Sequence, residues 1–344
     1  MGLGSALSCD MSKGLGVTAT QFFQLGSAAE PFVFGGGESL PGITLAYETY
    51  GTLNPDKSNA ILLFHALSGS QHAAGITPEV PGTDERWTDD IKHGWWNLFV
   101  GPGKALDTNR YFVICVNYLG GCYGSSGPAS INPATGKPYG KDFPSVLSSD
   151  VVRSQAALLD HLGISTLLAV IGASVGGLLA INFATLFPQR VKIVMPVATG
   201  LRTTVLTRLT LFEQVLAIEN DPHFKGGEYY DGPAPEYGLA LARMISHKTF
   251  VHLDAIENRA RQTVSQPNGQ LSWYKVGHNV ESYMLHQGKK FVKRFDANAY
   301  LRIINMWLRY DPLKDAGVES YEDLFAISRA AGHHYLIFSI DSDF

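Results

Sequence analysis

Short hydrophobic runs and amphipathic segments alternate along much of the chain. Residues 59–64, 111–116 and 167–171 are apolar runs bounded by turn-forming residues, a pattern typical of strands buried on both faces of a sheet. Between the second and third runs, residues 150–162 place apolar side chains at helical spacing, and Gly163 provides a helix stop. This order of strand, helix and strand predicts a parallel sheet with helices on its faces.

Three further strands are expected, at residues 43–50, 191–197 and 335–340. The first alternates like an edge strand, whereas the last resembles the other buried runs and follows a predicted helix at 321–331. From residue 199 to about residue 310 the chain consists mainly of amphipathic helical pieces, which interrupt the alternation of strands and helices. We therefore expect an α/β core that carries a helical insertion.

The predicted organisation has four parts. Residues 1–31 form an N-terminal leader, and residues 32–198 form the first part of the α/β core. Residues 199–312 are a helical lid insertion, and the core continues in residues 313–344. A length of 344 residues suits one large decorated fold of this kind.

Composition narrows the classes of function. Lys and Arg number 27 against 31 Asp and Glu, a net charge of −4 without a basic run, so nucleic acid is not an expected partner. The first 21 residues contain no long apolar run, which disfavours a secretory signal or a membrane span. The three cysteines, Cys9, Cys115 and Cys122, are an odd number in a long chain, so we expect no disulfide framework and a reducing compartment, the cytoplasm. The histidines are scattered, so no metal site is expected.

One motif carries a candidate nucleophile. The strand at 167–171 leads into Gly172-Ala-Ser174-Val-Gly176, and a helix is expected directly after it. This is the G-x-S-x-G turn in its strand-turn-helix context, where glycines leave room for a serine in a strained backbone conformation. A chance match in a Gly-rich chain is the alternative, but the flanking elements favour Ser174 as a nucleophile.

A serine nucleophile needs a base and an acid that orients the base. On a fold of this type the acid ends a later strand, and both Asp341 and Asp343 follow the run at 335–340. His333 and His334 precede that run, and no histidine follows it. The sequence therefore supplies two candidate acids and leaves the triad without its base.

Many segments resemble the homoserine O-acetyltransferases of methionine biosynthesis, which are α/β-hydrolase-fold acyltransferases. The resemblance covers nearly everything after about residue 32. It is carried by Leu-Ala-Tyr-Glu-Thr-Tyr-Gly at 45–51, His-Ala-Leu-Ser-Gly at 65–69, Gly-Trp-Trp-Asn at 94–97, Asn-Tyr-Leu-Gly-Gly-Cys at 117–122, Asp-Pro-His-Phe-Lys-Gly-Gly at 221–227 and Arg-Phe-Asp-Ala-Asn at 294–298.

The resemblance implies an α/β-hydrolase fold and a two-step transfer. Ser174 would take an acyl group from an acyl-CoA, acetyl-CoA in preference to succinyl-CoA, and pass it to the hydroxyl of homoserine. The amides of Leu67 and Val175 would form the oxyanion hole, Asp343 would be the acid, and Arg243 would hold the substrate carboxylate. The resemblance also implies a homodimer with no bound cofactor.

Two departures from the family keep alternatives open. Phe250 stands where the family tends to have a tyrosine near the substrate, which removes a hydroxyl donor. Family members continue beyond the position of Phe344 with a further helix, strand and helix and with a Gly-His-Asp segment that carries the base, so the last strand and helix are expected to be missing here. The alternatives are a succinyl-CoA-dependent or other-acceptor transferase, a serine hydrolase, and an inactive truncated homologue.

Overall fold

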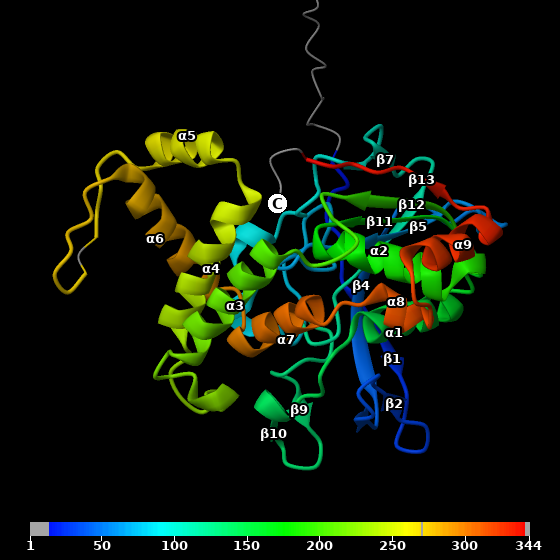
Figure 1. Ribbon diagram of the computed structural model, residues 1–344, viewed down its shortest axis with the longest axis horizontal. Helices are drawn as coiled ribbons and strands as arrows, with labels where there is room; N and C mark the ends of the chain where they lie inside the picture. The colour runs from blue at the N-terminus through cyan, green and yellow to red at the C-terminus, as the bar shows by residue number, and fades with distance from the viewer. Residues whose placement is uncertain (1–13, 270, 341–344) are drawn as a thin grey trace, which may run out of the picture.

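A seven-stranded sheet forms the centre of the molecule (Figure 1). The computed structural model describes residues 14–269 and 271–340. In spatial order the strands are β1 (Gln21–Leu25), β4 (Ile43–Tyr50), β8 (Phe112–Val116), β5 (Ala60–Phe64), β11 (Leu167–Ala173), β12 (Val191–Val197) and β13 (His334–Tyr335). The last five strands of this order run parallel to one another, whereas β1 and β4 are antiparallel to their neighbours.

Two hydrophobic cores lie on the two faces of this sheet. Ala60, Leu62 and Phe64 of β5 belong to the core beneath the helices, whereas Ile61 and Leu63 belong to the core on the opposite face. Successive strand residues point to opposite faces, so a strand covered on both sides reads as a continuous apolar run. The helices on the first face are α1 (Ser148–His161), α2 (Val175–Leu186), α8 (Pro312–Ala316) and α9 (Tyr321–Ala331) (Figure 1).

The elements predicted from periodicity are largely confirmed. The runs at 59–64, 111–116 and 167–171 correspond to β5, β8 and β11, and the run at 191–197 is β12. The helices expected after the second run and before residue 335 are α1 and α9. The mostly parallel sheet with flanking helices is the predicted α/β class.

The expectation of an edge strand at 43–50 is wrong in one respect. The strand exists as β4, but β1 pairs antiparallel with it on the outside, with Gln21 opposite Tyr47 and Leu25 opposite Ile43. β1 lies inside the segment assigned to the N-terminal leader. The strand, Gln-Phe-Phe-Gln-Leu, is short and half-exposed. Its pattern alone therefore does not distinguish it from the surrounding Gly- and Ser-containing segment.

The last expected strand is shorter and more exposed than its sequence suggests. β13 spans His334–Tyr335, and a single bridge joins Val197 to Phe338 farther along. Leu336 is 50% exposed and Ile337 is 64% exposed, so this strand is not buried. Within the described residues, β13 is the outer strand on its side of the sheet, and only one of its edges is paired.

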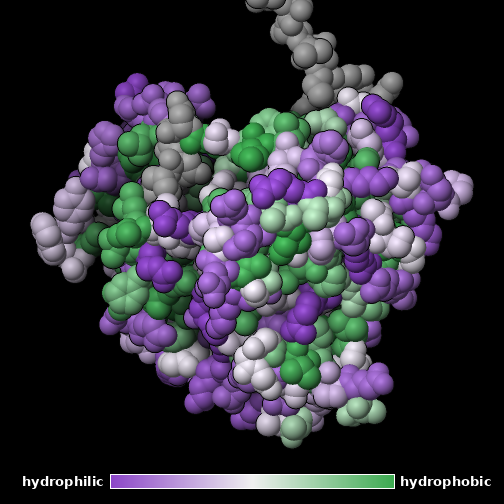
Figure 2. Space-filling model, turned by 45° about the vertical axis from the view of Figure 1, so that its right-hand side comes forward, coloured by the Kyte–Doolittle hydropathy of each residue, from purple (hydrophilic) through white to green (hydrophobic). Residues whose placement is uncertain are grey.

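Between β12 and α8 lies a group of helices set to one side of the sheet, which we call the helical insertion (Figure 1). It comprises α3 (Val205–Glu219), α4 (Glu236–Phe250), α5 (Leu253–Thr263), α6 (Asn279–Val292) and α7 (Ala297–Leu308). Two-stranded ladders are formed by β2 (Phe32–Val33) with β3 (Ser39–Leu40), β6 (Val100–Gly101) with β7 (Leu106–Asp107), and β9 (Ile131–Asn132) with β10 (Lys137–Pro138). On the face shown in Figure 2, hydrophobic residues are interspersed with hydrophilic ones.

Candidate active site

Ser174 occupies a strained turn between β11 and α2. Its φ is 55° and its ψ is −124°, a conformation that L-residues rarely adopt. A β-carbon on Gly172 would lie 1.9 Å from the carbonyl oxygen of Gly176, and one on Gly176 would lie 2.5 Å from the carbonyl oxygen of Phe64. The amide of Ser174 donates a 2.9 Å hydrogen bond to the carbonyl of Val197 at the end of the next strand. The two glycines and the neighbouring strand thus hold the half-buried serine in this turn.

Two backbone amides without acceptors lie in the turns after adjacent strands. Leu67 follows β5, and Val175 is the first residue of α2, after β11; Phe64 and Gly172 are paired where the two strands end. Neither the Leu67 amide nor the Val175 amide donates to an acceptor among residues 14–269 and 271–340. Both side chains are buried. Free amides at a helix N-terminus and in the facing turn favour negative charge, as an oxyanion hole requires.

Arg243 reaches the turn after β5 from the helical insertion. It lies in the middle of α4, and its Nη1 donates to the Ser68 hydroxyl at 3.5 Å. Its guanidinium carbon lies 4.8 Å from the ring centroid of Phe291 and 5.0 Å from that of Phe250. No carboxylate lies within salt-bridge distance of Arg243 in the part of the chain that the structure describes. A guanidinium among aromatic rings and without a counter-ion is suited to bind a carboxylate ligand.

The lowered pKa of Arg243 is also consistent with a carboxylate-binding role. Burial, together with the positive charge of Arg294, lowers the pKa of Arg243 to about 10. Both effects disfavour the charged guanidinium in the unliganded protein. A bound carboxylate would offset them, because it supplies the opposite charge where water is largely excluded.

Sequence reasoning missed Arg294, which follows α6. Its Nη1 donates to the Ser68 carbonyl at 3.3 Å and to the Tyr123 hydroxyl at 2.9 Å. Its Nε lies 3.9 Å from Asp90, and its guanidinium carbon lies 5.0 Å from the Phe291 ring. The segment that contains Arg294 was part of the family resemblance, but no spacing rule connects residue 294 with residue 68. Only the packing of the insertion on the core brings them together.

The acid and the base that a serine nucleophile needs are not located among the described residues. Asp343, and with it Asp341, lies outside the described residues. Among the described residues, no histidine is hydrogen-bonded to Ser174. His65, in the same turn as Leu67, is fully buried; its Nδ1 lies 2.7 Å from the Ala66 carbonyl, and its ring stacks on Tyr118 at 3.6 Å. The described residues therefore assign no base.

His72 is occupied by a buried carboxylate. Its Nδ1 lies 2.9 Å from Glu48, and its Nε2 lies 2.9 Å from the carbonyl of Lys92. Burial opposes ionisation of Glu48, but hydrogen bonds and the charge of His72 outweigh it and lower the pKa of Glu48. We interpret this pair as structural, because both ring nitrogens of His72 already have partners.

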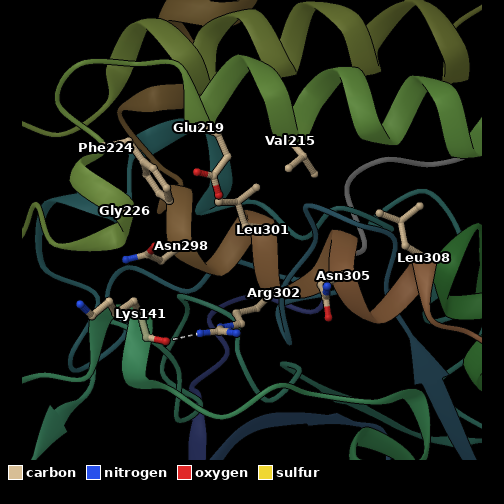
Figure 3. Close-up of a pocket in the computed structure, with 10 residues that line it drawn as sticks. All are labelled: Lys141, Val215, Glu219, Phe224, Gly226, Asn298, Leu301, Arg302, Asn305 and Leu308. Carbon is tan, nitrogen blue, oxygen red and sulfur yellow. Dashed lines mark hydrogen bonds between the residues drawn. The ribbon is translucent and has the colours of Figure 1, made fainter.

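Two cavities are present near these elements. One of about 210 Å³ lies beside the turn that carries Leu67 and is lined by residues that include Ser68, Asp90, Tyr123 and Arg294. The other, of about 230 Å³, lies between α3, α7 and the segment around Lys141; Figure 3 shows Arg302 donating to the Lys141 carbonyl at its floor. Neither cavity is lined by Ser174 or Arg243. The first adjoins the candidate site through Ser68 and Arg294, whereas the second shares no lining residue with the site.

Burial raises the pKa of Cys122 to about 12, which keeps that thiol protonated. Residues 14–269 and 271–340 contain no group of three or more His, Cys, Asp or Glu side chains that could hold a metal ion. None of the helices in those ranges combines the length and apolarity needed to cross a bilayer.

Comparisons with known proteins bear on the family and the fold. A family model for the α/β hydrolase fold matches residues 59–343. A homoserine O-succinyltransferase from Magnetococcus marinus is 41% identical over 342 residues, which are 97% of this chain and 83% of that protein. A homoserine O-acetyltransferase from Methanohalobium evestigatum is 46% identical over 292 residues, which are 84% of this chain and 56% of that protein.

Solved structures give the same picture. A homoserine O-acetyltransferase from Bacillus anthracis matches with a TM-score of 0.78 at 28% identity, covering 95% of this chain and 92% of that one. Esterase E22 matches with a TM-score of 0.78 at 28% identity, covering 94% of this chain and 93% of that one. A mostly parallel sheet with a serine on a strained strand-to-helix turn is characteristic of the α/β-hydrolase fold, which the matched family model describes. Within that fold, the chain belongs to the homoserine O-acyltransferase family.

Proposed function

We propose that this enzyme transfers the acetyl group of acetyl-CoA to the side-chain hydroxyl of L-homoserine, a step of methionine biosynthesis. Family membership supports acyl transfer to homoserine, because relatives that match most of this chain carry that activity in their names. The observation that carries the proposal is Arg243, a guanidinium without a carboxylate partner that reaches the turn facing Ser174. A simple ester hydrolase has no need of a carboxylate-binding group, whereas an amino-acid acceptor does.

The proposed mechanism has two steps. The Ser174 hydroxyl gives its proton to the base and attacks the thioester carbonyl; the new oxygen–carbon bond forms, the carbon–sulfur bond breaks, and the proton passes to the departing sulfur to release CoA. The homoserine hydroxyl then gives its proton to the base and attacks the acyl-serine; the bond between the acyl carbon and the Ser174 oxygen breaks, and the proton returns to Ser174 as the O-acyl product leaves. The Leu67 and Val175 amides would stabilise the oxyanion in both steps, and Asp343 would orient the base. Arg243 would bind the homoserine carboxylate and direct its hydroxyl to the acyl group.

The acyl donor and the assembly belong to the same proposal. We favour the acetyl group over the succinyl group; relatives of both kinds match the chain at similar identity, so the donor is a point for experiment. We also propose a cytoplasmic homodimer that uses the helical insertion. Exposed hydrophobic residues on α3 support this, namely Val205, Leu206, Leu209, Phe212 and Leu216. Light scattering at micromolar concentration should give twice the monomer mass, and a clean monomer would contradict the dimer.

The direct test is CoA release by the purified chain, followed with a thiol reagent. We expect release from acetyl-CoA to depend on homoserine and to vanish in Ser174→Ala, together with the acyl-enzyme detected by mass spectrometry. The control is Ser165→Ala, an exposed serine away from the turn, which should retain wild-type rates. Succinyl-CoA in parallel decides the donor.

Hydrolysis is the second candidate function, because esterase E22 matches the structure as well as the B. anthracis transferase does. An acyl-Ser174 that water can attack would release CoA at the same rate with and without homoserine. That result would replace the transferase by a hydrolase. Absence of release by a folded chain would instead favour an inactive homologue.

A further inference from the structure

Arg294 links the helical insertion to the turn that holds the Leu67 amide. The turn comprises residues 65–70, and Arg294 donates to the carbonyl of Ser68, the residue directly after Leu67. At the other end of the turn, the Tyr118 hydroxyl donates to the His65 carbonyl. The turn is closed by the Gly69 amide, which donates to the Ala66 carbonyl at 3.0 Å. The backbone around Leu67 is thus held from both sides by side chains outside the turn.

Arg294 is itself held firmly. The Tyr123 hydroxyl donates to the backbone carbonyl of Arg294 at 2.7 Å and accepts from its guanidinium at 2.9 Å. Tyr123 is 1% exposed, and the Arg294 side chain is 13% exposed. Asp90 lies 3.9 Å from Nε, and the Phe291 ring lies under the guanidinium. A side chain fixed by these contacts can position the turn, because its donor has little freedom to move away.

The contacts of Arg243 and Arg294 with Ser68 differ in kind. Arg243 donates to the hydroxyl at 3.5 Å and keeps donors free for a ligand, whereas Arg294 donates to the backbone carbonyl. A side-chain contact can change without moving the backbone, but a carbonyl contact fixes the peptide itself. Two guanidiniums near one turn therefore divide into a ligand-binding group and a group that holds the backbone.

We propose that Arg294 is a positioning residue, which fixes the 65–70 turn so that the Leu67 amide points at the oxyanion formed on the Ser174 acyl group. This inference rests on the proposed function and adds a residue to it. It makes the oxyanion hole depend on the docking of the helical insertion, since Arg294 is the second residue after α6. Removing the contact should impair acylation itself, before any acceptor is involved.

The test compares Arg294→Met and Arg294→Lys with Lys293→Met, a matched loss of charge at the exposed neighbouring position. The acylation burst with p-nitrophenyl acetate reports Ser174 chemistry without CoA or a carboxylate. We expect the burst rate to fall roughly 10- to 100-fold in Arg294→Met, less than a complete loss of one oxyanion donor costs. Arg294→Lys should recover part of the loss, and Lys293→Met should match wild type. The KM for homoserine should change little in Arg294→Met.

Hydrogen exchange supplies a readout that does not need activity. Amide exchange in the peptide spanning residues 65–70 should accelerate in Arg294→Met and remain at the wild-type rate in Lys293→Met. Unchanged exchange, or faster exchange with a wild-type burst rate, would overturn the inference. A burst that is normal while only the KM for homoserine rises would overturn it too, because Arg294 would then be a carboxylate ligand. If the wild-type chain never acylates Ser174, the proposed function fails, and with it the catalytic part of this inference, while exchange still decides whether Arg294 holds the turn.

Discussion

Gly172 and Gly176 approach so closely across the serine turn that a β-carbon on Gly172 would lie 1.9 Å from the Gly176 carbonyl oxygen. No side-chain rotation can relieve this overlap, because both partners belong to the backbone. The turn that exposes Ser174 therefore exists only with glycine at these positions. The motif read from the sequence is a steric requirement of the structure.

Gly172→Ala should distort the turn and destabilise the protein. We expect the free energy of unfolding to fall by at least about 2 kcal/mol, and the acyl-enzyme to be lost with it. The control is Gly36→Ala, where the added methyl group would meet only the Glu38 carboxylate at 3.5 Å, and which should stay within about 0.5 kcal/mol of wild type. Urea denaturation measures both. Wild-type stability in Gly172→Ala would contradict the described turn.

Arg243→Met should act on the acceptor and leave the donor alone. Loss of a charged hydrogen bond to the homoserine carboxylate predicts a KM for homoserine about 10- to 100-fold higher. The acylation burst, which involves no acceptor, should remain near wild type, in contrast to Arg294→Met. Lys248→Met removes a charge from the exposed end of the same helix and serves as the control. Equal losses in both steps would refute a carboxylate-binding role for Arg243.

Phe250→Tyr tests the departure from the family pattern. Phe250 ends α4, and its ring lies 5.0 Å from the guanidinium carbon of Arg243, so a hydroxyl added there would lie close to the proposed carboxylate site. One additional hydrogen bond predicts a KM for homoserine lower by about 3- to 10-fold. Steady-state kinetics at fixed acetyl-CoA measures the effect. No change in KM would mean that the ring lies away from the bound acceptor.

His65 should make the protein sensitive to acid. Burial lowers its pKa from 6.5 to about 4, so between these values the unfolded chain takes up a proton that the folded chain does not. Stability is therefore lost as the pH falls from about 6.5 to 4, by up to about 3 kcal/mol from this group. His65→Gln should flatten that part of the curve, whereas His286→Gln, at an exposed position on α6, should keep the wild-type slope. Urea melts at successive pH values measure the slope, and a wild-type slope in His65→Gln would contradict the prediction.

The sequence was informative where local chemistry decides structure. Continuous apolar runs identified β5, β8, β11 and β12, because a strand covered on both faces cannot alternate. It was less informative at the two ends of the sheet. β1, within residues 1–31, pairs with β4 although no pattern predicts it, and the apolar run at 335–340 is largely exposed because β13 has a partner on one side only among the described residues.

By itself, the sequence determined the strand-turn-helix around Ser174, since Gly172 must avoid the carbonyl of Gly176 only four residues further on, and its many matched segments determined the family. The meeting of Arg243 and Arg294 on Ser68 was decided by tertiary structure alone. Each arginine lies more than 170 positions after Ser68 along the chain, and both contacts depend on how the helical insertion packs on the core. Long-range packing of this kind leaves no periodicity in the sequence, because it is set by the shapes of two assembled surfaces.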